Sequence, residues 1–321
     1  MQYKTIPKFA ERKFDKGEYE VKKVLKWIGI VLGSLIGLIL LAGIVMVMIG
    51  NSRLNKTYDF PPSNITIPTD AASIERGKHR VEALCQGCHG PDLGGINQWF
   101  NAGPIGTVDS TNLTSGEGGF ASEATSDEDF VRAIRHGIGL DGKPIFMPAV
   151  ESTSYLSDED LGAIIAYVKS VPPVDHVTNG HNFTPLAKIL FVLGQLPNMP
   201  AETVSHEIHV TAPEAGATME YGEYMVNTND CRACHGPDLN GGPFPDPTIT
   251  KISPNLTPGG ELSAWTEEEF ITAIRTGVMP SGYKLDNEFM PWETFRNYTD
   301  DELKAIWLYL QSLPALPQWT K

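Results

Sequence analysis

Two kinds of residue are scarce in this sequence, and each scarcity excludes a class of protein. Only four of the 321 residues are cysteines, and they form two close pairs that begin 146 positions apart. A four-cysteine zinc site would have to join these distant pairs. Basic residues are also few, with 25 Lys and Arg against 39 Asp and Glu. Residues 1–26 have a net charge of +4 and the remainder −18, which argues against nucleic acid and favours a basic or neutral protein partner.

Long apolar sequence is limited to one run near the N-terminus. Residues 28–49 contain no charged side chain, and as a helix they would measure about 33 Å, close to the thickness of a bilayer core. A cleaved signal peptide is the alternative, but the run is long for one and no small-residue cleavage site closes it. Lys22, Lys23 and Lys26 precede the run and predict a cytoplasmic N-terminus. The bulk of the chain would then lie on the periplasmic face of a bacterial inner membrane.

Each cysteine pair belongs to a five-residue motif, C-x-x-C-H. The two copies consist of Cys85, Cys88 and His89, and of Cys231, Cys234 and His235. Two thiols about one helical turn apart, followed by an imidazole, are typical of covalent haem c attachment, with the histidine as iron ligand. C-x-x-C alone would also suit a redox dithiol or half a zinc ribbon. Both copies carry the histidine, so we predict two covalently bound haem c groups as cofactors.

The same landmarks follow each motif in the same order, which indicates one domain type used twice. Acidic residues after a Ser or Thr predict capped helices in matching places. The paired landmarks are Asn-Leu-Thr at 112–114 and 255–257, a helix from Ser126 and from Thr266, Arg-x-Gly at 135–137 and 275–277, Phe-Met-Pro at 146–148 and 289–291, and a last helix from Ser157 and from Thr299.

The segments between these landmarks complete the predicted organisation. A helix is expected from about Asp70 to Leu84, residues 95–125 are expected to be mostly loop, and the apolar insert 186–193 is a candidate helix packed between domains. The predicted division is 1–26 cytoplasmic arm, 27–50 transmembrane anchor, 51–69 extended spacer, 70–173 first domain, 174–217 linker and 218–321 second domain.

A second axial ligand is expected from methionine in each repeat. Met147 is the only methionine between positions 48 and 199 and is followed by proline. The second repeat offers Met279 and Met290, and the shared Phe-Met-Pro context favours Met290, because Met279 aligns with Gly139. With His89 and His235, these methionines would make both irons six-coordinate, as suits electron transfer.

Supporting roles follow from the repeat and from general haem chemistry. The second N–H of each axial imidazole needs a carbonyl acceptor, for which prolines in the following loops are candidates. Arg135 and Arg275 occupy matched positions and could pair with haem propionates or simply end a solvated helix. The remaining histidines are expected to be surface or supporting residues. The proline candidates are Pro104 in the first repeat and Pro243, Pro245 and Pro247 in the second.

Taken together, each repeat resembles class I cytochrome c, on the evidence of C-x-x-C-H-G, Asn-Leu-Thr, Arg-x-Gly, Met-Pro and two acidic-capped helices. Residues 70–316 as a whole resemble the tandem dihaem cytochromes that serve membrane electron-transfer complexes. The resemblance implies a mainly α fold of two tandem cytochrome c domains after one N-terminal transmembrane helix. It also implies an electron-transfer role rather than a catalytic one, with no catalytic residues.

The expected function is therefore a membrane-anchored dihaem cytochrome in a respiratory or photosynthetic complex. Its expected partners are other subunits of that complex and a soluble cytochrome or cupredoxin. One alternative is a dihaem enzyme, such as a peroxidase or sulfur-compound oxidoreductase, in which one iron has an exchangeable ligand. Another is an assembly subunit with structural haems. The sequence does not identify the complex, the donor or the acceptor.

Overall fold

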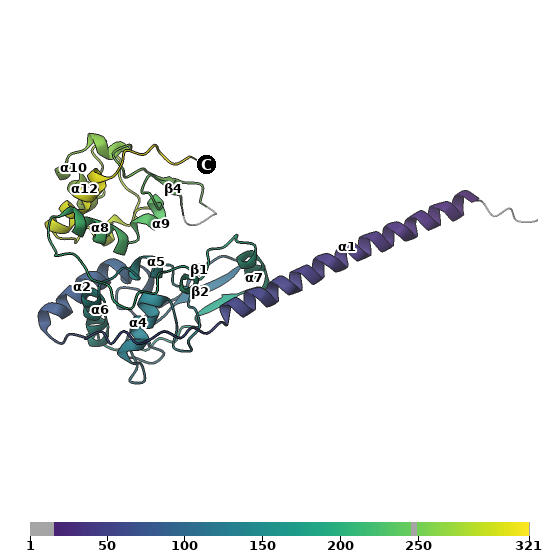
Figure 1. Ribbon diagram of the computed structural model, residues 1–321, viewed down its shortest axis with the longest axis horizontal. Helices are drawn as coiled ribbons and strands as arrows, with labels where there is room; N and C mark the ends of the chain where they lie inside the picture. The colour runs from purple at the N-terminus through teal and green to yellow at the C-terminus, as the bar shows by residue number, and fades with distance from the viewer. Residues whose placement is uncertain (1–15, 245–248, 321) are drawn as a thin grey trace, which may run out of the picture.

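The computed structural model describes residues 16–244 and 249–320, and it places one long helix before two packed domains (Figure 1). Helix α1 (Lys16–Leu54) projects away from both domains, and each domain contains one pair of crossing helices. The prediction of a mainly helical fold is confirmed. The predicted arm 1–26 lies largely outside the described residues.

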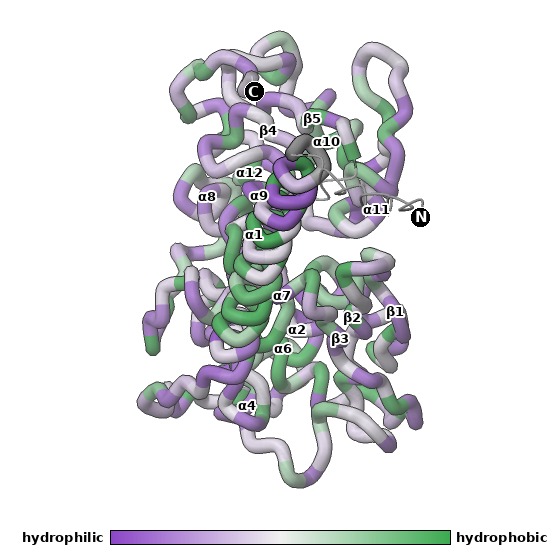
Figure 2. The backbone as a smooth tube through the Cα atoms, turned by 90° about the vertical axis from the view of Figure 1, so that its right-hand side faces the viewer, coloured by the Kyte–Doolittle hydropathy of each residue, from purple (hydrophilic) through white to green (hydrophobic). Residues whose placement is uncertain are grey.

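Helix α1 is long and apolar enough to cross a membrane over Tyr19–Leu54, and it is the one such helix in the described part of the chain. Its most apolar window is not buried against the rest of the protein. Figure 2 shows the hydrophobic stretch continuing along the helix up to the first domain. An apolar surface of this length left open is what a lipid-facing helix requires.

The first domain is built on the crossing of α2 (Ala71–Leu84) with α6 (Asp158–Ser170). Asp70 caps α2 by accepting from the Ser73 amide at 3.0 Å, so the helix begins where it was predicted. At the crossing, a Cβ on Gly77 would lie 1.9 Å from the carbonyl oxygen of Ala163. Only glycine permits this approach, which brings Val81 and its neighbours into the core.

The second domain repeats this crossing with α8 (Met219–Thr228) and α12 (Asp300–Ser312). A Cβ on Gly222 would lie 1.9 Å from the carbonyl oxygen of Ala305, the same distance as at Gly77. The third helix of each domain is α4 (Asp127–His136) or α10 (Glu267–Thr276). The two cores are therefore assembled around matching glycines.

The predicted helix caps are present with one difference. Ser126, Thr266 and Thr299 each form a reciprocal capping box with the residue three positions later. Ser157 also caps its helix, accepting from the Asp160 amide at 3.1 Å. The Asp160 carboxylate does not return the bond, because it is used at the domain interface.

The loop predicted at 95–125 is wrong in part, because it contains two strands. Strand β1 (Ile96–Asn101) pairs antiparallel with β2 (Gly106–Ser110), and β2 pairs with β3 (His181–Phe183). Because β3 comes from the interdomain segment, the sheet depends on pairing between distant residues that local sequence does not report. The second domain has only a two-residue ladder, β4 (Gly242–Pro243) with β5 (Ile252–Ser253).

The apolar insert forms the helix that was predicted, but not in the predicted place. Helix α7 (Pro185–Val192) packs against the end of α1 rather than between the domains. The segment 55–69, which connects α1 to α2, also contacts the first domain. In this segment, the amide and hydroxyl of Ser63 donate to the Glu128 carboxylate. The remaining short elements are α3 (Gln86–His89), α5 (Val150–Thr153), η1 (Pro200–Glu202), α9 (Cys231–His235), η2 (Glu261–Ala264) and α11 (Trp292–Phe295).

Candidate functional site

Each C-x-x-C-H motif lies on a single short helical turn at the end of a core helix. Cys85 lies between α2 and α3, and Cys231 begins α9 after the two residues that follow the end of α8, Asn229 and Asp230. All four cysteines are unpaired and half-buried. The two thiols of each motif are therefore separated by one helical turn, with the histidine at the end of the same turn.

Both motif histidines are held by a backbone carbonyl. His89 donates from Nδ1 to the oxygen of Thr111 at 2.7 Å, and His235 donates from Nδ1 to the oxygen of Pro254 at 2.9 Å. Because a carbonyl only accepts, Nδ1 carries the proton and Nε2 keeps its lone pair. Burial lowers the pKa of both imidazoles, which favours the neutral form that binds metal.

The predicted acceptors were wrong, and the reason is visible in the Asn-Leu-Thr landmark. Neither Pro104 nor Pro243 accepts from these histidines, while Pro245 and Pro247 lie outside the described residues. The acceptor in each repeat is the residue just before Asn-Leu-Thr. The repeat therefore contained a signal for the acceptor, because the same position is occupied by Thr111 in the first repeat and by Pro254 in the second.

Buried asparagines hold that acceptor segment in place. The Asn112 side chain donates to the oxygen of Val174 at 2.7 Å and accepts from the Thr114 amide at 2.9 Å. Asn255 donates to the oxygen of Leu316 at 2.7 Å and accepts from the Thr257 amide at 2.8 Å. These asparagines therefore act as turn residues.

The electrostatics of the thiols differ from those of a thiolate site. Burial raises the pKa of Cys85 and of Cys231 to about 12, and that of Cys88 to about 11. Reactive dithiols and zinc ligands instead need a lowered thiol pKa. Within 16–244 and 249–320, no three His, Cys, Asp or Glu side chains gather as around a metal ion, so the four cysteines do not converge on one site.

The Phe-Met-Pro loops are supported alike in the two domains. Phe146 packs edge-to-face on Phe183 of β3, and Phe289 packs edge-to-face on Phe244 beside β4, with ring centroids 5.6 Å apart in both cases. Both methionines are half-buried. The chain reaches each loop by the same turn, in which the Gly139 amide or the Met279 amide donates to a carbonyl four residues later. This correspondence supports the alignment of Met279 with Gly139.

The residues around His235 leave space for a large apolar ligand. A pocket of about 540 Å³ is lined by Pro254, Trp265, Met279 and Tyr283 among others. The indole N–H of Trp292, two residues after Met290, is buried without a hydrogen-bond partner among the described residues. The pocket includes Pro254, whose carbonyl holds His235, and the Trp292 donor follows Met290 in the chain; both features are compatible with a haem that has polar edge groups.

The two matched arginines do not serve as propionate partners. Arg135 is fully buried and donates to the oxygens of Leu156 and Ile208. Arg275 donates to the oxygens of Arg296 and Tyr298. Both arginines thus hold the chain that precedes the last helix of their domain, which is a structural role.

Among the other histidines, which were expected to be surface or supporting residues, His136 is a buried, supporting one. It is buried, with Nδ1 3.2 Å from Nδ1 of His206, and it stacks on Phe60. Burial and the neighbouring His206 lower the pKa of His136 to about 4. The cluster ties the segment after α1 to the end of α4.

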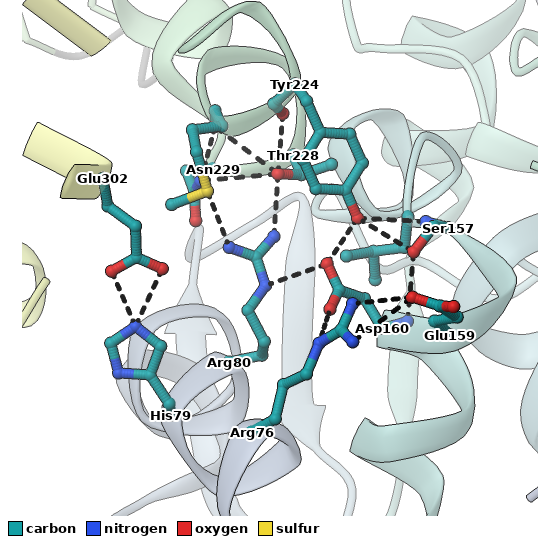
Figure 3. Close-up of polar contacts among 12 residues, drawn as sticks. Arg76, His79, Arg80, Ser157, Glu159, Asp160, Tyr224, Thr228, Asn229 and Glu302 are labelled. Atoms are coloured by element: carbon teal, nitrogen blue, oxygen red, sulfur yellow. Dashed lines mark hydrogen bonds and ion pairs between the residues drawn. The ribbon is translucent and has the colours of Figure 1, made fainter. Parts of the chain in front are cut away.

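A buried polar network joins the two domains (Figure 3). Arg80 in α2 donates from Nη2 to the Thr228 hydroxyl in α8 at 2.8 Å, and its Nε lies 3.8 Å from an oxygen of Asp160. Asp160 accepts from the Tyr224 hydroxyl at 2.5 Å. Because α2 leads into one C-x-x-C-H motif and α8 into the other, the network sets how the two motifs face each other.

Further contacts bring the two motifs close together. Asp230, just before Cys231, hydrogen-bonds with Ser152 of the first domain, and its charge contributes to the raised pKa of Cys88. A second pocket of about 400 Å³ is lined by Gly87 of the first motif and Asn287 of the second methionine loop. The interface therefore lies between the two candidate sites.

Comparisons with known proteins agree with this duplicated geometry. The family described as "Cytochrome C oxidase, cbb3-type, subunit III" matches residues 72–168, and the family described as "Cytochrome c" matches residues 219–314. The matched ranges contain both motifs and both methionine loops.

Curated relatives are similar over most of the chain. The "Alcohol dehydrogenase (quinone), cytochrome c subunit" of Gluconobacter oxydans is 28% identical over 283 residues, which cover 78% of this chain and 56% of that protein. The "Gluconate 2-dehydrogenase cytochrome c subunit" of Pantoea cypripedii is 26% identical, covering 76% of this chain and 60% of that protein. The "Diheme cytochrome c-type" protein of Cereibacter sphaeroides is 26% identical, covering 72% and 82%.

The chain spans a little over half the length of the first of these relatives. The chain is therefore homologous to cytochrome c subunits of dehydrogenases, and it contains two cytochrome c domains in tandem with two covalently bound haem c groups.

Proposed function

We propose that this protein is a membrane-anchored dihaem cytochrome c that receives electrons from a partner subunit and passes them on. The observation that carries the proposal is the repeated geometry of the two sites. Each site has a neutral histidine with a free Nε2 and a half-buried methionine in a loop of the same construction. When bound, each haem supplies reversible one-electron chemistry.

The proposed attachment and ligand residues are those of the motifs and loops. The thiols of Cys85 and Cys88, and of Cys231 and Cys234, form the thioethers. The motif histidine and the loop methionine of each domain would both hold the haem iron, which would leave no exchangeable position for a substrate. The protein ligands to iron are His89, Met147, His235 and Met290.

The closeness of the motifs supports transfer of electrons within the chain. Asp230, beside Cys231, reaches Ser152 and lies near Cys88, so the two attachment turns meet at the domain interface. Direct contacts among the buried side chains of Arg80, Asp160 and Tyr224 hold this interface together. A fixed separation is useful because electron transfer depends steeply on distance between the redox groups.

The proposed location is the periplasmic face of a bacterial inner membrane, with α1 as the anchor. The exposed apolar length of α1 supports the anchor. The cluster Lys22, Lys23 and Lys26 at its N-terminal end supports a cytoplasmic N-terminus. Domains 70–173 and 218–321 would then stand outside the cytoplasm, where c-type haem is attached.

The proposed partner is a dehydrogenase subunit, by analogy with relatives whose names describe cytochrome subunits of alcohol, gluconate and fructose dehydrogenases. The acceptor could be another component of a respiratory or photosynthetic complex, a soluble cytochrome or a cupredoxin. The strongly acidic domains would attract basic or neutral docking surfaces, with an association rate that falls as salt increases.

The ligand assignment is tested by comparing Met147→Ala with Met290→Ala in the holoprotein. We expect each variant to keep two covalent haems, to lose about half of the far-red Met–Fe(III) absorption band, and to show a high-spin signal from one haem. Loss of the whole band in one variant, or of none in either, would contradict the assignment. A high-spin haem in the unaltered protein would favour the dihaem enzyme instead.

The partner assignment is tested by purification from the native membrane in mild detergent. A dehydrogenase subunit should accompany the cytochrome, and its substrate should reduce both haems in the complex. Recovery of a lone monomer that turns over a soluble substrate would overturn the role as an electron-transfer subunit.

A further inference from the structure

The outer face of α7 is apolar, and part of it is exposed to solvent. We propose that α7 is an interfacial helix whose outer face lies in the headgroup and upper acyl region of the bilayer that α1 crosses. The inference rests on the proposed membrane anchor and adds a second contact with lipid. It concerns how the first domain is oriented on the membrane.

The apolar face follows helical spacing. Leu186, Ile189, Leu190 and Leu193 stand at intervals of three and four residues, the pattern of one helix face. Leu186 is 43% and Leu193 is 54% exposed. The opposite face is buried, through Ala187 and Phe191. The helix therefore has two apolar sides, of which the protein covers only one.

Contacts with the end of α1 place α7 at a defined height. Gly50 lies so close to α7 that a Cβ there would be 2.7 Å from the carbonyl oxygen of Lys188. Lys188 donates from Nζ to the side-chain oxygen of Asn51 at 2.9 Å. The apolar run of α1 ends at Ile49, shortly before Asn51 and the charged Arg53. Helix α7 thus meets α1 where the apolar core of the bilayer would give way to headgroups.

Arg53 closes this arrangement one turn further along α1. It donates from Nη1 to the oxygen of Phe191 at 3.2 Å and from Nη2 to the Asn198 side chain at 2.8 Å. The same guanidinium pairs with Glu202 at 2.5 Å. Because both the end of α7 and the segment after it are held, the helix cannot swing away from α1 without breaking these bonds.

The occupant that fits the outer face is lipid, because the face continues an apolar surface that α1 already presents. Val45, Met48 and Ile49, in the last turns before the contact, are 45%, 66% and 46% exposed. Viewed from the side from which α1 projects, hydrophobic α7 lies beside hydrophobic α1 (Figure 2). A short helix with one apolar face at this depth is typical of an interfacial segment.

The contact would orient the first domain through a row of aromatic rings. Phe191 of α7 packs on Phe183 of β3, with centroids 5.3 Å apart, and Phe183 packs on Phe146, next to Met147. The membrane contact would therefore be linked rigidly to the methionine side of the first site. The domain would rest on the bilayer in one orientation instead of swinging on a tether.

The test uses the full-length holoprotein in lipid nanodiscs, with single cysteines labelled by a nitroxide. The test positions are Leu186→Cys and Leu193→Cys, and the control is Val177→Cys, which is 58% exposed on the first domain. The lipid reference is Leu38→Cys in the middle of α1. With the haems reduced, power saturation by oxygen, which enters lipid, is compared with that by a water-soluble nickel chelate.

We expect the oxygen-to-nickel accessibility ratio at Leu186→Cys and Leu193→Cys to be several-fold above that at Val177→Cys and below that at Leu38→Cys. A ratio equal to the control would overturn the inference, because the face would then be in water. Low accessibility to both reagents would also overturn it, because a protein partner would cover the face. Failure of the Leu38→Cys reference would instead contradict the membrane anchor itself.

Discussion

The centres of the two domains are nearly identical, whereas their surroundings differ. Each centre has a histidine whose Nδ1 donates to a backbone carbonyl, at 2.7 Å in the first domain and 2.9 Å in the second. Each also has a glycine at its helix crossing, where an added Cβ would lie 1.9 Å from a carbonyl oxygen of the facing helix. Even the left-handed residue after each motif is shared, since Leu93 and Leu239 have φ of 59° and 57°. The repeated parts are those that a haem requires.

The differing parts are those that face other structures. The first domain adds a three-stranded sheet, α7 and the segment 55–69, all of which link it to α1. The second domain has a two-residue ladder and a longer methionine loop. Its side facing the first domain carries Asp230, an extra residue before Cys231 with φ of 60°. The two domains therefore share the residues of the haem site, and they differ in the elements that contact α1 or the other domain.

The largest effect should come from breaking the contact between the domains. Arg80→Met removes the buried charge beside Asp160 and the donor to the Thr228 hydroxyl, and we expect a loss of about 4 kcal/mol of unfolding free energy. Arg76→Met is the control, because Arg76 also pairs with Asp160 but its side chain is 45% exposed. Urea unfolding followed by haem absorbance measures both. An Arg80→Met protein as stable as Arg76→Met would contradict a stabilising interface.

The matched helix crossings should respond alike to overpacking. Gly77→Ala and Gly222→Ala each place a methyl group against a carbonyl 1.9 Å away, so we expect a loss of about 3 kcal/mol from either. The pair is measured by thermal unfolding, with Gly87→Ala as control, where no atom lies within 4 Å. A large difference between the stability losses of the two variants would show that the domain cores are not energetically equivalent, although their crossings have the same geometry.

The matched arginines should respond differently. Arg135 is fully buried and pairs with Asp158 at 2.8 Å, whereas the side chain of Arg275 is 35% exposed and pairs with Asp300. We expect Arg135→Met to cost about 2 kcal/mol more than Arg275→Met, because it leaves buried carbonyls unsatisfied. Denaturant midpoints of the two variants decide this. Equal losses would mean that burial does not distinguish the domains at this position.

The smallest effect should be a pH dependence of the interface. The hydrogen bond to Glu302 at 2.9 Å raises the pKa of His79, and pairing with His79 helps to lower the pKa of Glu302. The stabilisation that protonated His79 contributes is complete below about pH 6.5, and it is lost as the pH rises through the higher pKa of the folded protein. The stabilisation that ionised Glu302 contributes is lost as the pH falls through its lowered pKa, below about 4.3.

Stability should therefore fall by less than about 1 kcal/mol between pH 6 and pH 9 through this pair, since His79 is partly exposed. His79→Gln should remove that part of the pH dependence while His209→Gln, at a more exposed pair with Asp158, should leave it in place. The difference is read from urea titrations at the two pH values. If the unfolding free energy of His79→Gln depended on pH as strongly as that of the unaltered protein, the His79–Glu302 pair would not contribute to the pH dependence.

Much of the local structure could be predicted because its causes are local. The caps at Ser126, Thr266 and Thr299 and the start of α2 depend on residues within one turn, so their pattern is sufficient. The repeat also identified both methionine loops. The carbonyl that holds each histidine was missed, because the acceptor is a backbone atom and the residue that carries it differs between the repeats, although its position before Asn-Leu-Thr is the same.

Sequence by itself determined the two attachment motifs, the paired landmarks and the charge-free run before them. These are properties of neighbouring residues, and spacing is enough to express them. Only the tertiary structure decided that β3, from His181, completes a sheet that begins at Ile96, that α7 packs on α1, and that Arg80 joins the domains. Each of these depends on which distant surfaces gain most by burial together, and a linear pattern carries no record of that choice.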